Sequence, residues 1–80
     1  MIKIIVQYFA ILREQRGLNK EEVLSNAKTA VELYAELRQK HNFSLNTDIL
    51  KVAINDEFCD WTTTLKSGDQ VVFIPPVAGG

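Results

Sequence analysis

The residues best suited to chemistry stand at the C-terminus, where residues 75–80 read PPVAGG. Glycine has no Cβ, so Gly79 and Gly80 form a thin segment whose terminal carboxylate fits a narrow cleft of another protein. Proline lacks a backbone N–H and fixes its own φ, so the two prolines are expected to end the preceding strand and to direct the tail outward. A disordered chain end or a cloning remnant also fits a terminal Gly-Gly, and both alternatives stay open here.

Two further side chains that often act in catalysis occur once each, Cys59 and His41. Cys59 has no basic neighbour that would favour the thiolate, so a small, partly buried structural role is expected. His41 falls in the last turn of a predicted helix, where it is expected to complement the helix dipole. A single cysteine forms neither an intramolecular disulfide nor a zinc site of paired cysteines. We therefore expect no metal site, and a reducing compartment, the cytoplasm, as the location.

The composition indicates one small globular domain. Of the 80 residues, 46% are hydrophobic and 24% charged, which is too apolar for a disordered chain. Nine Lys and Arg against ten Asp and Glu give a net charge of -1, which argues against a nucleic-acid binder. Residues 46–80 hold two basic and five acidic side chains, so this half is expected to face an electropositive partner, unless the charges only solvate it. No segment approaches membrane-spanning length, and no membrane association is expected.

Five segments have the composition of strands. β-branched and aromatic residues bounded by turn residues predict strands at residues 2–8, 20–25, 50–54, 57–59 and 71–74. Residues 9–17 indicate a short helical turn or an ordered loop that ends at Gly17. Between the third and fourth strands, Asn55-Asp56 fits a hairpin turn that requires positive φ.

One helix is predicted to start at Thr29, because Glu32 follows it three residues later and the two can form a capping box with each other's backbone N–H groups. The apolar residues of this segment recur at helical spacing on one face, namely Ala30, Leu33, Tyr34 and Leu37. Glu36 and Lys40 are predicted to form a favourable i,i+4 pair on the opposite face. Asn42 is expected to end the helix in the left-handed conformation.

The last predicted strand is apolar on both faces. Strand alternation places Val71 and Phe73 on one side and Val72 and Ile74 on the other. If the helix covers the first side, Val72 and Ile74 form with Phe58 an exposed apolar patch suited to docking a partner. The alternative, that loops bury this second side, stays open.

The order strand, strand, capped helix, strand, strand, strand favours an α+β fold: one main helix packed across a mixed sheet of four or five strands, the ubiquitin-like β-grasp layout. We expect a β-grasp domain in residues 1–75 and an extended tail in residues 76–80.

Over nearly its whole length the sequence resembles the small subunits of molybdopterin synthase, a family of sulfur carriers. The matching residues are Tyr8-Phe9-Ala10, Arg13-Glu14, Gly17, Thr29-Ala30-Val31-Glu32-Leu33, Val52-Ala53-Ile54-Asn55, Leu65, Gly68-Asp69, Val71 and Phe73-Ile74-Pro75-Pro76-Val77-Ala78-Gly79-Gly80. The last block is the most specific. Ile74 departs mildly from it, because the family usually has an aromatic or large apolar residue there, and this affects only the fit to the partner.

The resemblance implies that Gly80 is the reactive residue. An adenylyltransferase of the ubiquitin-activating type would use its own bound ATP to join AMP to the Gly80 carboxylate. A persulfide would then displace AMP and leave a thiocarboxylate. The large catalytic subunit of molybdopterin synthase would receive this sulfur and build molybdopterin from cyclic pyranopterin monophosphate in two carrier turns. The chain would be a non-catalytic donor without a tightly bound cofactor, in a heterotetramer of two small and two large subunits.

The same resemblance assigns roles to the remaining residues. Pro75 and Pro76 would limit the entropy that the tail loses on insertion, while Val77, Ala78 and Gly79 would keep it narrow. The expected docking residues are Phe58, Val72 and Ile74, together with Val77. Three alternatives remain: another β-grasp sulfur carrier of thiamine synthesis or a different thiolation pathway, a ubiquitin-like protein modifier, and a β-grasp interaction module with an inert tail.

Overall fold

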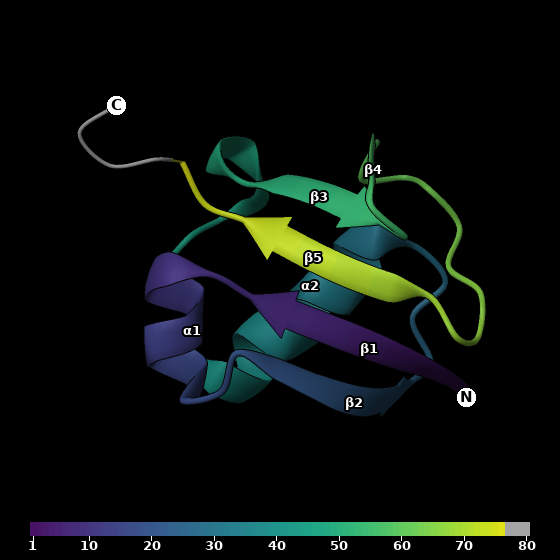
Figure 1. The fold of residues 1–80 in the computed structure, drawn as a ribbon, viewed down its shortest axis with the longest axis horizontal. Helices are drawn as coiled ribbons and strands as arrows, with labels where there is room; N and C mark the ends of the chain where they lie inside the picture. Colours follow the sequence, from purple (N-terminus) through teal and green to yellow (C-terminus); the bar gives the residue numbers. More distant parts are fainter. Residues whose placement is uncertain (77–80) are drawn as a thin grey trace.

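A long helix, α2, packs across one face of a five-stranded sheet in the computed structural model of the chain, which describes residues 1–76 (Figure 1). The elements in chain order are β1 (Ile2–Tyr8), α1 (Ala10–Arg16), β2 (Lys20–Ser25), α2 (Ala30–His41), the 3-10 turn η1 (Thr47–Ile49), β3 (Lys51–Ile54), β4 (Glu57–Cys59) and β5 (Gln70–Ile74). The four residues 77–80 lie outside the described part of the chain.

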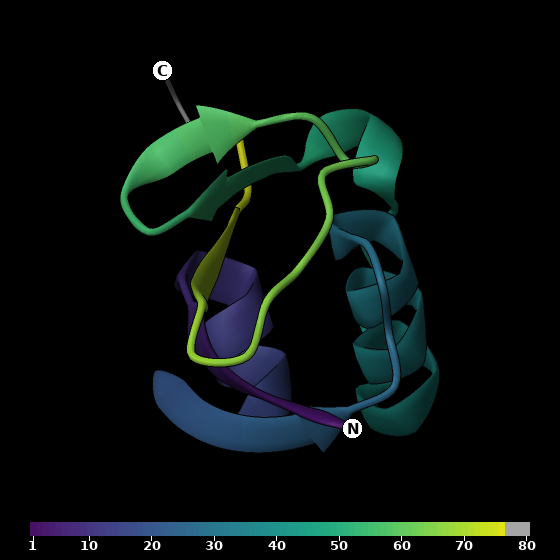
Figure 2. The same cartoon turned by 90° about the vertical axis from the view of Figure 1, so that its right-hand side faces the viewer.

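The sheet is mixed, with the strand order β2-β1-β5-β3-β4. β1 pairs antiparallel with β2 and parallel with β5, and β3 pairs antiparallel with both β4 and β5. A parallel pair cannot be joined by a tight turn, so the chain crosses over between β1 and β5. α2 lies in this crossover on one side of the sheet, as Figure 2 shows. This arrangement confirms the predicted β-grasp layout.

The core fills the space between α2 and the sheet. Alternate residues of β1 and β5 face the helix, and Val71 and Phe73 are fully buried there, as predicted. The predicted apolar face of α2 is buried against them. Its residues are Ala30, Leu33, Tyr34 and Leu37. Within residues 1–76 no helix is long and apolar enough to cross a membrane.

The start of α2 differs in one detail from the predicted capping box. Thr29 Oγ1 accepts a hydrogen bond from the Glu32 N–H at 3.4 Å, as expected. The Glu32 carboxylate, however, accepts from the N–H of Lys28 at 2.9 Å and not from that of Thr29. A β-bridge between Thr29 and Thr64 holds the chain extended before the helix and so brings the Lys28 N–H within reach. At the other end, Asn42 has φ 57°, which confirms the predicted left-handed cap.

One local prediction needs correction, and one choice between two alternatives is decided. The pair between Glu36 and Lys40 was wrong: no ion pair joins them within residues 1–76, and Glu36 instead accepts a 2.6 Å hydrogen bond from Ser25 Oγ. Ser25 is only 2% exposed, so its hydroxyl is held in place by the fold. Glu36 therefore bonds to this fixed hydroxyl in place of the surface side chain of Lys40, which would lose entropy on pairing. Of the two alternatives given for residues 9–17, a short helical turn or an ordered loop, the structure has the helical one: α1 ends at Gly17 with φ 82°.

Candidate functional site

The side of the sheet opposite α2 carries a row of paired residues that crosses four strands and is apolar on β5, β3 and β4. In the strand register Gln7 pairs with Val72, Val72 with Ala53, and Ala53 with Phe58. Paired residues project to the same face of a sheet, so Phe58 and Val72 share this open side. Phe58 is 70% exposed, an unusual position for a large aromatic side chain.

A shallow hollow of about 260 Å³ marks this face, which we call the docking face. Its lining residues are Gln7, Phe9, Ala53, Asp56, Phe58, Val72 and Ile74. The structure thus brings together the three residues singled out in the sequence, Phe58, Val72 and Ile74. Sequence reasoning did not identify Phe9 and Asp56 as members of this surface, because they reach it from the segment before α1 and from the β3–β4 turn.

A second hollow, of about 210 Å³, lies at the root of the tail. Its lining residues are Ile49, Lys51, Ile74, Pro75 and Pro76. β5 ends at Ile74, as expected from the prolines that follow. Pro75 is buried and Pro76 is exposed. Ile74 lines both hollows, so the docking face continues to the point where the tail begins. Of the predicted tail, residues 76–80, the structure describes Pro76. The other predicted tail residues lie outside the described part of the chain, namely Val77, Ala78, Gly79 and Gly80.

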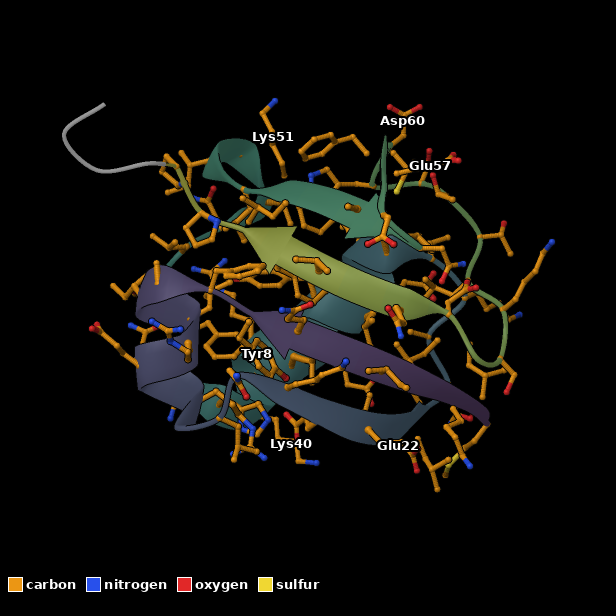
Figure 3. All side chains as sticks on the ribbon, in the orientation of Figure 1. Tyr8, Glu22, Lys40, Lys51, Glu57 and Asp60 are labelled. Atoms are coloured by element: carbon orange, nitrogen blue, oxygen red, sulfur yellow. The ribbon has the colours of Figure 1, made fainter. Side chains whose placement is uncertain are left out.

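Charged residues surround the docking face unevenly. Asp56, Glu57 and Asp60 are exposed on and after the β3–β4 hairpin. Lys51 lies at the other end of β3, near the tail root; Figure 3 labels Lys51, Glu57 and Asp60. The acidic character predicted for residues 46–80 is therefore concentrated around the hairpin, at the rim beside Phe58. Such a rim would attract a partner with basic side chains at the matching positions.

The two lone reactive residues lie away from the docking face. Cys59 is half-buried, with Sγ 3.8 Å from the Val52 carbonyl oxygen, in keeping with the predicted structural role. His41 packs against Phe43, with ring centroids 5.6 Å apart, and burial lowers its pKa. The buried Nε2 of His41 has no hydrogen-bond partner among residues 1–76. Across the same residues, no cluster of three His, Cys, Asp or Glu side chains could hold a metal ion.

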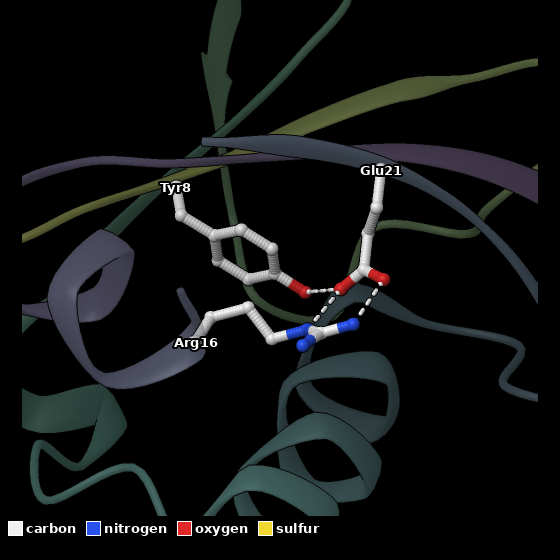
Figure 4. Close-up of polar contacts among 3 residues, drawn as sticks. All are labelled: Tyr8, Arg16 and Glu21. Atoms are coloured by element: carbon white, nitrogen blue, oxygen red, sulfur yellow. Dashed lines mark hydrogen bonds and ion pairs between the residues drawn. The ribbon is translucent and has the colours of Figure 1, made fainter. Parts of the chain in front are cut away.

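A polar cluster that the sequence did not reveal joins β1, α1 and β2 (Figure 4). The Tyr8 hydroxyl donates to Glu21 Oε2 at 2.7 Å, and Arg16 donates to both carboxylate oxygens. These bonds, that of Arg16 above all, lower the pKa of Glu21, while burial raises the pKa of Tyr8 far above its usual value. Because Tyr8 points to the core side of the sheet, we assign the cluster a structural role.

Comparison with known protein families matches residues 6–80 to the ThiS family. The chain belongs to the ThiS family. One relative of this ThiS-family protein is the molybdopterin synthase sulfur carrier subunit of Mycobacterium tuberculosis. The two sequences are 36% identical in an alignment of 83 positions that covers 100% of each chain. The family resemblance stated from the sequence is thereby confirmed.

Solved structures share the fold of this ThiS-family protein. SAMP1 from Haloferax volcanii superposes with a TM-score of 0.80 over 98% of this chain and 99% of its own; at 24% identity it shows the fold alone. A chain from the protein–protein complex of subunits 1 and 2 of the Helicobacter pylori molybdopterin-converting factor has a TM-score of 0.70 and 29% identity, over 99% of this chain and 100% of its own.

Proposed function

We propose that this chain is the sulfur carrier of molybdenum cofactor biosynthesis, the small subunit of molybdopterin synthase. The observation that carries the proposal is the 36% identity, over the full length of both chains, to a relative named as that carrier subunit. The C-terminal Gly79-Gly80 and the apolar face beside the tail root support it, because a carrier needs both a slender reactive end and a surface for its partners.

Gly80 is the residue that reacts in this proposal. A carboxylate oxygen is a poor leaving group, so sulfur cannot replace it directly. An adenylyltransferase of the ubiquitin-activating type joins the Gly80 carboxylate to AMP and releases pyrophosphate from its bound ATP. A persulfide sulfur attacks the acyl carbon and AMP leaves; a thiol then cleaves the sulfur–sulfur bond, and a thiocarboxylate remains. The nucleotide and the sulfur are only transiently attached to this chain.

The docking face binds the partners through Phe58, Val72 and Ile74. The Helicobacter pylori complex supports a second subunit as partner, since it joins a chain of this fold to subunit 2. We propose the large catalytic subunit of molybdopterin synthase in this place, in a heterotetramer of two small and two large subunits. Among residues 1–76, Asp56 is the one ionisable residue that lines the hollow of the docking face. We propose that the large subunit supplies the acid–base chemistry at the cyclic pyranopterin monophosphate.

The proposal also divides the chain into a β-grasp domain, residues 1–75, and a tail, residues 76–80, that enters the partner. Pro75 and Pro76 limit the freedom that the tail loses on entry, and the small residues Ala78 and Gly79 let it pass a narrow channel. We place this exchange in the cytoplasm.

The intact mass of the chain tests the chemistry at Gly80. After incubation with the adenylyltransferase of the molybdopterin pathway, ATP and a sulfur donor, the mass should increase by the difference between sulfur and oxygen. A chain that lacks Gly80 serves as the control and should keep its mass. Conjugates of higher mass would indicate a protein modifier, and activation only by the corresponding enzyme of thiamine synthesis would indicate another carrier. Full function without Gly80 would indicate an inert tail.

A further inference from the structure

Asn55, the first residue of the β3–β4 turn, hydrogen-bonds to β5 and so extends the β3–β5 hydrogen-bond ladder by one residue pair. The antiparallel pairing of β3 with β5 ends at Ile54 opposite Val71, so Asn55 and Gln70 come next. Asn55 has φ 52° and turns away into the hairpin. Its N–H still donates to the Gln70 carbonyl at 2.8 Å, and its side-chain Oδ1 accepts from the Gln70 N–H at 3.0 Å. The side chain thus replaces the backbone carbonyl that the turn has removed from the ladder.

Asp69 completes this connection from the other side. Its Oδ1 accepts from Asn55 Nδ2 at 3.0 Å, and its Oδ2 accepts from the Lys66 N–H at 2.8 Å. Because the Gln70 N–H fixes which end of the Asn55 amide is oxygen, the nitrogen must face Asp69. The Asp69 side chain is buried, and its backbone carbonyl accepts from Ile5 N–H at 3.0 Å. The Asn55–Asp69 bond therefore links the hairpin turn to the central strands.

The hairpin needs such a link because little else holds its outer strand. β4 has three residues and, in the described part of the chain, pairs only with β3, which in turn makes four pairs with β5. Phe58, in the middle of β4, is 70% exposed. A shift of one residue in a strand register would move its side chains to the other face of the sheet.

We propose that Asn55 and Asp69 are positioning residues of the docking face. Their hydrogen bond holds the β3–β4 hairpin so that Phe58 stays aligned with Val72 and Ile74, and this alignment governs the affinity for the large subunit. The inference rests on the proposed function, since it assigns these residues to the binding of that partner. We assign neither residue a part in the reaction at Gly80.

Substitution can exchange the amide of Asn55 and the carboxylate of Asp69, and this gives variants with clearly different hydrogen-bonding patterns. Asp69→Asn places two NH₂ groups opposite each other, and Asn55→Asp places two carboxylates opposite each other. The double swap N55D/D69N restores every bond: the new amide at position 69 accepts from Lys66 N–H and donates to the new carboxylate at position 55. Asn55→Gly keeps the left-handed turn and removes only the side chain.

Binding of the full-length variants to the large subunit of molybdopterin synthase tests the proposal, with affinities referred to the folded fraction. Asp69→Asn and Asn55→Asp should each weaken binding about three- to tenfold, the range expected for one lost hydrogen bond, and the double swap should restore it. Asn55→Gly, which loses both side-chain hydrogen bonds of Asn55, should weaken binding at least as much. In a Phe58→Ala background the same variants should have little further effect, because they act through Phe58. The proposal would be overturned if the single variants bound the large subunit like wild type, or if the double swap bound it no better than the single variants. It would also be overturned if the single variants weakened binding as strongly in the Phe58→Ala background as in the wild-type chain.

A measurement without the partner separates this inference from the proposed function. In Asn55→Gly, hydrogen exchange should quicken at the β4 amides and at Gln70 N–H, which loses Asn55 Oδ1 as its acceptor. Exchange at the paired amides of β1 and at residues 71–74 of β5 should stay as in wild type. Unchanged exchange at β4 would overturn the positioning role. A wild-type chain that does not bind the large subunit would contradict the proposed function, and the exchange result would then decide the inference alone.

Discussion

Arg16 holds the carboxylate of Glu21 in a two-bond arrangement, with Nε 2.7 Å from Oε2 and Nη2 2.8 Å from Oε1. The guanidinium comes from the end of α1 and the carboxylate from β2, so the pair closes the loop between these elements. Only 25% of the Arg16 side chain and 15% of the Glu21 side chain are exposed. Planar two-bond pairs of this kind are stronger than single surface contacts.

Glu21→Gln should therefore destabilise the fold. An uncharged amide cannot accept from both guanidinium nitrogens and the Tyr8 hydroxyl, so we expect a loss of about 1.5 to 3 kcal/mol in the free energy of unfolding. Glu22→Gln is the matched control, because Glu22 lies on the same strand, is exposed and reaches Lys3 only at 3.8 Å. It should change stability by less than about 0.5 kcal/mol in urea unfolding. Equal losses in both variants would contradict the role of the cluster.

The free energy of unfolding should fall as the solution is acidified, in two stages. Burial lowers the pKa of His41 in the fold, so its contribution is lost as pH drops below the unfolded value of about 6.5. Arg16 lowers the pKa of Glu21, whose contribution is complete above its unfolded pKa, about 4.3, and is lost as pH falls through the lower folded value. Urea unfolding across this range should show that His41→Gln flattens the first stage and Glu21→Gln the second. A stability that rises on acidification would contradict both assignments.

Phe58→Ala should weaken the binding of the large subunit about thirtyfold, because a central aromatic residue of a docking surface typically contributes about 2 kcal/mol. The melting temperature should change little, since 70% of the side chain is exposed. Leu24→Ala supplies a matched control: Leu24 is 64% exposed and lies on the edge strand β2, away from the hollow. Calorimetric titration that finds the same loss for both variants would rule out a specific docking face.

The two prolines should separate folding from tail insertion. Pro75 is buried, so Pro75→Ala is expected to lower stability by about 1 kcal/mol. Pro76 is exposed, and Pro76→Ala should leave the melting temperature nearly unchanged. It should nevertheless raise the Kd for the large subunit about two- to fivefold, because a freer tail loses more entropy on insertion. An unaltered Kd would show that tail stiffness does not matter.

Local signals predicted much of this fold. The β3–β4 turn has φ 52° at Asn55 and 70° at Asp56, as the hairpin pattern required. Asn42 caps α2, and alternation along β5 correctly placed Phe73 in the core. In each case the deciding interaction lies within a few residues of the sequence.

Contacts between distant segments could not be predicted in this way. The bond from Ser25 to Glu36 displaced a reasonable i,i+4 pair, and the Asn55–Asp69 bond spans 14 residues. The sequence pattern grouped Phe58 with Val72 and Ile74 but not with Phe9, because nothing local shows that a residue before a helix borders a row of paired residues crossing four strands.

Transfer of sulfur from the thiocarboxylated chain is the decisive test of whether this chain is the sulfur carrier of molybdopterin synthase. The chain is first converted to the thiocarboxylate, then mixed with the large subunit and cyclic pyranopterin monophosphate, and its intact mass is followed with time. The mass should return to that of the carboxylate as molybdopterin forms, and omission of the large subunit or the pterin should prevent this. A thiocarboxylate that persists when both are present would contradict the proposed function.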